Sequence, residues 1–111
     1  MLHREHEVRK YHTSSAADLL QETMEYHKIT QTDLAERLGT SQKRISEILR
    51  RKSYIDETLA LRIEQVMGIS SILLLNLDSN YKLHLAKAEQ KNLSVNQNSD
   101  KFLKRYDWVT I

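Results

Sequence analysis

The sequence contains no cysteine and no proline, and only two of its 111 residues are glycine. Without cysteine the chain can form neither a disulfide nor a thiolate metal site, which fits a reducing compartment. Folds made only of strands need many turns and therefore many glycine and proline residues, so this scarcity favours an all-α fold. The length corresponds to about one domain, and chains of this size often gain stability by dimerising.

Long hydrophobic runs are also absent. The N-terminal stretch MLHREHEVRK is charged and lacks the apolar segment of a signal peptide. The longest purely apolar run covers residues 72–75, which is far too short to span a bilayer. We therefore expect a soluble, cytoplasmic protein with no membrane partner.

Neither sign of charge dominates, since 17 basic and 15 acidic residues leave a formal net charge of +2. The distribution is nevertheless uneven. Residues 16–38 are mainly acidic, whereas residues 42–52 carry five basic side chains against Glu47 alone. Positive charge gathered in one short segment is expected where a single element contacts phosphate.

The spacing of apolar residues predicts helices over residues 15–28, 31–38, 42–51, 57–67 and 72–88. A serine, threonine or aspartate stands at the expected start of each helix, and Thr30 with Asp33 has the form of a capping box. Gly39 and Gly68 follow the second and fourth helices, where a left-handed residue commonly ends a helix. We therefore expect a five-helix, all-α domain over residues 15–89, preceded by a flexible arm over residues 1–14.

Residues 90–111 are expected to form a linker followed by an aromatic tail. Residues 90–100 are polar and asparagine-rich, and the stretch after them contains Phe102, Tyr106 and Trp108. These side chains either fold back on the core or dock on a partner or second subunit, because interfaces favour aromatic residues. The alternation of side chains over residues 106–111 would also suit a short strand added to a neighbouring sheet.

The fifth predicted helix is apolar almost all round near its start, over residues 73–77. Such a helix must be covered on more than one side, by the core, by a dimer seam or by both. The candidate partner or dimer contacts are therefore Leu74, Leu77, Phe102, Tyr106 and Trp108.

The segment QTDLAERLGTSQKRISEILRRK, residues 31–52, has the pattern of a helix-turn-helix. Two helices that cross steeply need a small residue at their closest approach, and Ala35 supplies it. Gly39 turns the chain four residues later, and Ile45 would anchor the second helix in the core. These three residues between two amphipathic helices indicate a helix-turn-helix that binds DNA.

The second helix of this motif presents side chains suited to the major groove, where Gln, Lys and Arg pair with purine edges and Glu accepts from cytosine. Gln42, Lys43 and Ser46, near its N-terminus, are the first candidates for base contacts, and Glu47 is the next candidate. Gln31 starts the preceding helix, where a phosphate can bind. The full predicted set is Gln31, Ser41, Gln42, Lys43, Arg44, Ser46, Glu47, Arg50, Arg51 and Lys52, of which the last three are expected on the DNA backbone.

Residues 16–88 resemble the Xre/Cro-type helix-turn-helix family, which has the lambda-repressor-like fold and includes phage repressors. The segment TQTDLAERLGTSQKRISEILRRK carries this resemblance. Within the family the chain looks most like the HigA-type antitoxins, because RISEILRRK is followed by LALRIEQVMG and SSILLLNLDSNYKLHLAKAE. The resemblance implies a homodimer that represses its own operon on double-stranded operator DNA, associates with the nucleoid through that DNA, and blocks a HigB-like, mRNA-cleaving toxin.

Two other functions stay open on the sequence. A stand-alone repressor of a phage or mobile element would bind DNA without a toxin partner, and gene context would separate it from an antitoxin. A pure interaction module that kept the fold and lost DNA binding is disfavoured by Gln42, Lys43 and Arg44, since these side chains are suited to a groove.

No catalysis, metal site or cofactor is expected. The three histidines of the N-terminal arm have no carboxylate or cysteine at ligand spacing. The acid pairs Glu22 with Glu25 and Glu57 with Glu64 are expected on helix surfaces, and no nucleophile and base accompany them. The sequence therefore predicts a binding protein and not an enzyme.

Overall fold

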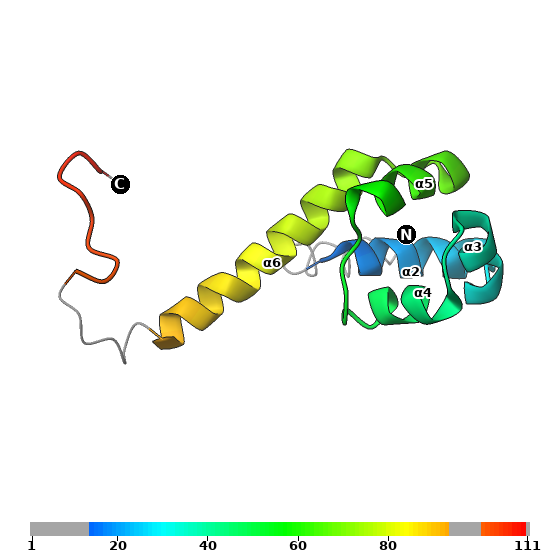
Figure 1. Ribbon diagram of the computed structural model, residues 1–111, viewed down its shortest axis with the longest axis horizontal. Helices are drawn as coiled ribbons and strands as arrows, with labels where there is room; N and C mark the ends of the chain where they lie inside the picture. The colour runs from blue at the N-terminus through cyan, green and yellow to red at the C-terminus, as the bar shows by residue number, and fades with distance from the viewer. Residues whose placement is uncertain (1–13, 94–100, 111) are drawn as a thin grey trace.

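The computed structural model describes residues 14–93 and 101–110, and the regular secondary structure within these ranges is entirely helical (Figure 1). The helices are α2 (Ala16–His27), α3 (Gln31–Leu38), α4 (Gln42–Leu49), α5 (Glu57–Met67) and α6 (Ser71–Leu93). The predicted five-helix, all-α fold is thereby confirmed. The predicted arm falls outside the described residues, except for Ser14.

Side-chain oxygens begin the helices, as the sequence pattern predicted. Thr30, Ser41 and Asp56 each accept a hydrogen bond from the backbone N–H three residues later, at 3.1, 3.1 and 2.8 Å. Ser70 does the same for α6, at 3.2 Å. Each bond satisfies a backbone donor that the first turn of a helix would otherwise leave unpaired.

The capping box predicted for α3 is only half formed. Thr30 caps the helix, but the Asp33 carboxylate accepts a hydrogen bond from Arg37 Nε at 3.0 Å. Residues at i and i+4 are neighbours on a helix surface, so the arginine competes for the carboxylate. A complete capping box instead begins α2, where Asp18 accepts from the backbone N–H of Ser15 at 2.9 Å.

The core lies between α2, α3, α4, α5 and the first half of α6. Its largest fully buried apolar side chains are Leu20, Leu34, Leu38, Ile45, Ile48, Ile63 and Leu74. The assignment of Leu74 as a partner or dimer contact is therefore wrong, because α6 packs on both α2 and α5 and this side chain is 0% exposed. Leu77, one turn later, is half-buried.

Asp78 joins three parts of this body. Its carboxylate is 4% exposed and accepts one hydrogen bond from the backbone N–H of Ala16, at 2.9 Å, and another from that of Ile55, at 3.2 Å. The buried charge is thus satisfied by two backbone donors. One side chain on α6 consequently holds the start of α2 and the loop between α4 and α5.

The second half of α6 does not pack on the other helices. All residues from 82 to 91 are exposed, and Figure 1 shows this part of α6 running away from the body. The helix ends at Leu93 and not near Ala88, so the first residues of the predicted linker are helical. Ala, Glu, Gln and Lys dominate this stretch, and all four favour a helix.

Residues 101–110 form turns and not the short strand that their alternation suggested. The backbone N–H of Val109 donates to the Tyr106 carbonyl at 3.1 Å, and a turn here ends the extended geometry that alternation requires. The rings of Tyr106 and Trp108 stack, with centroids 4.5 Å apart and planes at 9°. These two side chains are 68% and 74% exposed, so they do not fold back on the core.

Candidate DNA interface

Helices α3 and α4 meet at a tight corner built on the three residues that the motif predicted. Ala35 is 3% exposed at their packing surface, and Ile45 is fully buried. Gly39 ends α3 with a φ of 69°, in the left-handed region that glycine adopts without strain. The backbone N–H groups of Gly39 and Thr40 donate to the Glu36 and Ala35 carbonyls at 3.3 and 3.0 Å, which closes the end of α3.

Two further contacts hold this corner in place. From α5, Arg62 Nη1 donates a hydrogen bond of 3.1 Å to the carbonyl of Leu38, the last residue of α3. From α3, Thr32 Oγ1 donates to Gln42 Oε1 at 3.2 Å, on the first residue of α4. The orientation of α4 relative to α3 is therefore fixed by polar contacts as well as by the core.

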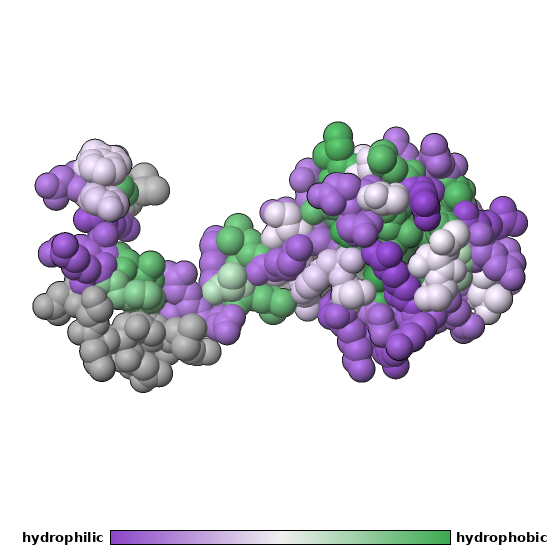
Figure 2. Space-filling model, in the orientation of Figure 1, coloured by the Kyte–Doolittle hydropathy of each residue, from purple (hydrophilic) through white to green (hydrophobic). Residues whose placement is uncertain are grey.

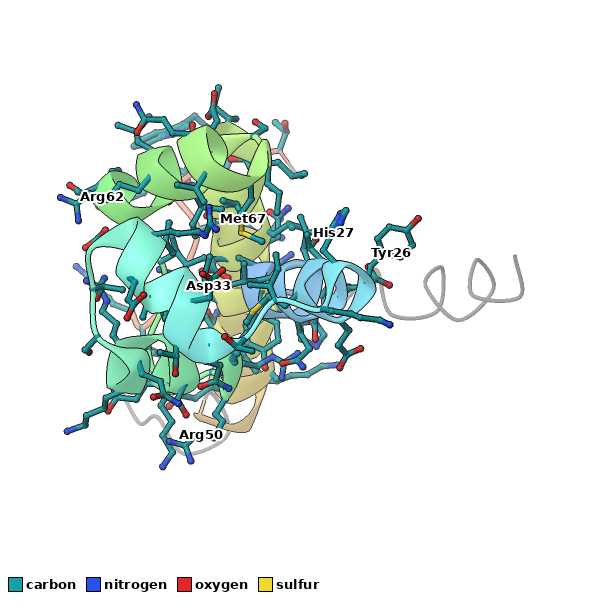
Figure 3. All side chains as sticks on the ribbon, turned by 90° about the vertical axis from the view of Figure 1, so that its right-hand side faces the viewer. Tyr26, His27, Asp33, Arg50, Arg62 and Met67 are labelled. Carbon is teal, nitrogen blue, oxygen red and sulfur yellow. The ribbon has the colours of Figure 1, made fainter. Side chains whose placement is uncertain are left out.

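The outward face of α4 carries most of the predicted contact residues. Ser41, Gln42, Lys43 and Arg50 are exposed, and Ser46 and Glu47 are half-buried. Figure 3 shows Arg50 pointing away from the helices. Within the described residues, no side-chain hydrogen bond or ion pair engages Lys43, Arg50 or Lys52, so their charges are available to an anionic partner. Gln31 lies half-buried at the first position of α3.

Arg44 behaves differently from these cations. Its Nη2 donates to Asp56 Oδ2 at 3.1 Å, and Asp56 is the residue that caps α5. The backbone N–H bond from Leu59 and the Arg44 guanidinium hold the pKa of the Asp56 carboxyl below its usual value. The Asp56 carboxylate therefore stays ionised at neutral pH, at the edge of the α4 surface.

Arg51 is also engaged inside the protein. It pairs with Asp18 of α2, and its guanidinium lies 5.7 Å from the ring centroid of Tyr81 on α6. The hydrogen bond to Asp18 raises the pKa of Arg51. The predicted contact of Arg51 with the DNA backbone would have to break or share this pair, so the structure assigns it first to tying α4 to α2 and α6.

A shallow cavity lies at the other end of the domain, between α2, α3 and α5. Its volume is about 320 Å³, and its lining includes His27, Asp33, Arg37 and Met67. Figure 3 shows Asp33 and Met67 well separated from Arg50. In residues 14–93 and 101–110 no group of three or more His, Asp or Glu side chains could hold a metal ion, and no described helix is long and apolar enough to cross a membrane.

Residues 20–74 match the family model described as helix-turn-helix. The chain carries a helix-turn-helix domain of this Xre/Cro-type family. The matched region runs from α2 into α6 and contains the α3–α4 corner. In helix-turn-helix domains the second helix lies in the major groove and the first crosses the DNA backbone, and α4 and α3 are the corresponding helices of this chain. The family is a class of DNA-binding proteins and not of enzymes.

Solved structures share the fold of this helix-turn-helix protein. Pseudomonas aeruginosa antitoxin HigA, solved with the higBA promoter, is 22% identical, with a TM-score of 0.69 over 80% of this chain and 98% of that chain. Antitoxin GraA is 19% identical, with a TM-score of 0.70 over 78% and 95%. The Pseudomonas aeruginosa protein PA4674, solved with its operator DNA, is 22% identical, with a TM-score of 0.68 over 78% and 96%. Among proteins of curated function, none matches the sequence.

Sequence reasoning missed the residues that position α4. Asp56 was recognised as a cap but not as the partner of Arg44, and no role was assigned to Thr32 or Arg62. Their contacts join residues that are 10 to 24 positions apart in the chain. Helical periodicity carries no signal for such contacts. For Thr32, the one available signal was its position: it is a polar residue in the first turn of α3, opposite the first turn of α4.

Proposed function

We propose that the protein is a DNA-binding antitoxin that represses its own operon and neutralises a HigB-like, mRNA-cleaving toxin. DNA binding is supported mainly by the outward face of α4. Lys43 and Arg50 are exposed there, and their side chains form no ion pair within the described residues. The helix-turn-helix family supports DNA as the ligand. The structural similarity to antitoxins supports a toxin as the protein partner.

In this proposal α4 enters the major groove of double-stranded operator DNA. Gln42, Lys43 and Ser46 contact base edges from the first turns of the helix, and Glu47 is the next candidate. The N-terminus of α3, with Gln31, faces a phosphate. Ser41 lies at the junction between the two helices, and Arg50 and Lys52 lie beyond the groove on the DNA backbone.

We propose that the protein acts as a homodimer on an inverted repeat. Leu61, Val66, Ile72 and Leu73 are 40% to 69% exposed on α5 and the first turn of α6. Figure 2 shows hydrophobic surface over this corner of the body. Clustered apolar side chains on a small protein commonly mark an interface. A two-fold dimer would place its two copies of α4 about one DNA turn, roughly 34 Å, apart.

The toxin contact is proposed for the C-terminal part of the chain. Leu83 and Leu85 are exposed on the projecting half of α6, at 54% and 46%. Phe102, Tyr106 and Trp108 are exposed further on, and large aromatic side chains are the residues that interfaces favour most. Half-buried Leu77 lies at the junction between this projecting half and the core. These residues offer a partner an apolar surface separate from α4.

A pull-down of the tagged full-length protein from its native host at moderate salt tests the proposal, with bound protein and DNA both identified. We expect a small RNase-like protein together with the promoter of the protein's own gene. Promoter DNA without such a protein would establish the stand-alone repressor instead. An RNase-like protein without DNA would contradict the role of α4.

Binding assays on duplex DNA from that promoter then test the residues. Lys43→Ala should weaken binding to promoter DNA by about 1–3 kcal/mol and binding to a scrambled duplex less. Arg50→Ala should weaken both and flatten the salt dependence. Arg37→Ala is the matched control, because Arg37 is an exposed cation that lies on α3 and pairs with Asp33. A loss for Arg37→Ala equal to that for Lys43→Ala would contradict the assignment.

A further inference from the structure

The Asp56 carboxylate connects two helices by using its two oxygens for different tasks. Oδ1 accepts the backbone N–H of Leu59 at 2.8 Å and so caps α5. Oδ2 accepts Arg44 Nη2 at 3.1 Å. Because the cap fixes the carboxylate to the start of α5, the arginine is attached to a rigid element and not to a mobile side chain.

Arg44 is held at its other end as well. Its backbone N–H donates to the Ser41 hydroxyl at 3.1 Å, in the first turn of α4. A guanidinium has five N–H donors in a planar fork, and Asp56 takes one of them. The side chain is 37% exposed, so the rest of the fork lies at the surface beside the residues proposed for base contacts.

The negative charge of Asp56 has a second effect. A carboxylate at the edge of a DNA-facing surface repels phosphates and competes with them for the arginine. An unpaired Arg44 could swing to any nearby phosphate, which every DNA sequence provides. The ion pair with Asp56 opposes such phosphate contacts and keeps the guanidinium of Arg44 in one orientation.

We propose that Asp56 is a positioning residue that directs Arg44 at a base, so that it sets sequence preference without touching DNA. The proposal rests on the proposed DNA-binding function. A held fork with free N–H donors fits the two acceptors of guanine, O6 and N7, in the major groove. Arg44 and Asp56 together would therefore select a guanine at one position in each half-site.

Asp56→Asn is the test variant, because asparagine caps helices as well as aspartate does and removes only the charge. The full-length variant is compared with the wild type on a duplex from the protein's own promoter and on a scrambled duplex of the same composition. We expect promoter affinity to fall by about threefold to tenfold, which lies in the lower part of the range for two side chains in contact. Affinity for the scrambled duplex should stay equal or rise.

Asp33→Asn is the matched control. Like Asp56, Asp33 has a carboxylate that is about half exposed, and it pairs with an arginine at 3.0 Å. Unlike Asp56, it caps no helix, and it lies on α3 beside the shallow cavity. Its removal should leave the ratio of the two affinities unchanged. Melting curves of both variants show whether either has lost its fold. Asp56→Ser, which also keeps a helix cap, serves as a second test of the Arg44–Asp56 pair.

Combination with Arg44→Ala decides whether Asp56 acts through the arginine. In the Arg44→Ala background, Asp56→Asn should cause no further loss of promoter preference. An equal loss on both duplexes, an additive loss in the double variant, or a rise in promoter preference would each overturn the proposal. A wild type that binds both duplexes equally would refute sequence-specific binding itself, and the inference would fail with it.

Discussion

The backbone N–H of Ala16, at the start of α2, donates a 2.9 Å hydrogen bond to the carboxylate of Asp78 on α6. The same carboxylate accepts from Ile55, between α4 and α5. The helix-turn-helix is therefore closed by one buried acid that joins residues 62 positions apart. The start of α2 cannot move away from α6 without leaving these buried polar groups unpaired.

Asp78→Ala should destabilise the fold strongly. The substitution leaves two buried N–H donors without an acceptor, at about 1–3 kcal/mol for each buried group. Asp78→Asn keeps one acceptor oxygen and should cost less. Chemical denaturation of both variants measures the difference, with exposed Asp33→Asn as the control. An Asp78→Ala variant as stable as the wild type would show that the clamp contributes nothing.

The two glycines offer a matched comparison. Gly39 and Gly68 both have positive φ, at 69° and 76°, so alanine should cost about 1 kcal/mol at either position. At Gly39 the added Cβ also meets Arg62 Nη1 at 3.4 Å, whereas nothing lies within 4 Å at Gly68. We expect similar losses of melting temperature, with promoter binding reduced only in Gly39→Ala. Reduced binding in Gly68→Ala would contradict a specific role for the α3–α4 corner.

Arg51 stands in the left-handed region with a φ of 62°, at the end of α4. Its N–H and that of Lys52 donate to the carbonyls of Ile48 and Glu47, in the pattern that usually takes glycine. Arg51→Gly loses the contacts with α2 and α6 but gains about 1 kcal/mol by relieving backbone strain. Arg51→Ala loses the contacts without that gain, so it should be the less stable of the two.

The DNA-binding behaviour of the same variants separates Arg51 from its neighbour. Because Arg51 is engaged by Asp18, its loss should change the salt dependence of DNA binding less than Arg50→Ala does. Titrations of promoter DNA at several salt concentrations measure both slopes. Equal slopes for the two variants would support a contact of Arg51 with the DNA backbone, as the sequence alone predicted.

Acid should weaken the helix starts of α5 and α6. Hydrogen bonds lower the pKa of Asp56, mainly through the N–H of Leu59, and that of Glu64 through Ser71. A lowered folded pKa stabilises the protein at pH values above the unfolded pKa, near 4, and this gain is lost as the pH falls through the folded pKa. Stability should therefore decline below about pH 4, and less steeply in Glu64→Gln. An unchanged acid slope in that variant would refute the contribution of Glu64.

The sequence predicted what depends on neighbours along the chain. The α3–α4 corner is indicated by Ala35, Gly39 and Ile45, and the helix starts by caps such as Thr30 and Ser41. These signals are visible in the sequence because each depends on residues only a few positions apart. Contacts between distant segments left no comparable pattern, so the Asp78 clamp and the pairing of Arg51 became visible only in the structure. The prediction of a strand in residues 106–111 was wrong for a related reason, since alternation predicts a strand only where another strand is present to pair with it.

The projecting half of α6 makes the protein simple to extend. An unbroken run of exposed residues begins at Lys82, whose ammonium group lies 4.8 Å from the ring centroid of Tyr54, and the helix continues for about three turns from there to Leu93. A second protein joined in helical register at this point would share one continuous rod with the DNA-binding body. Its rotation about the axis of α6 would then be set by the number of residues inserted, at about 100° for each.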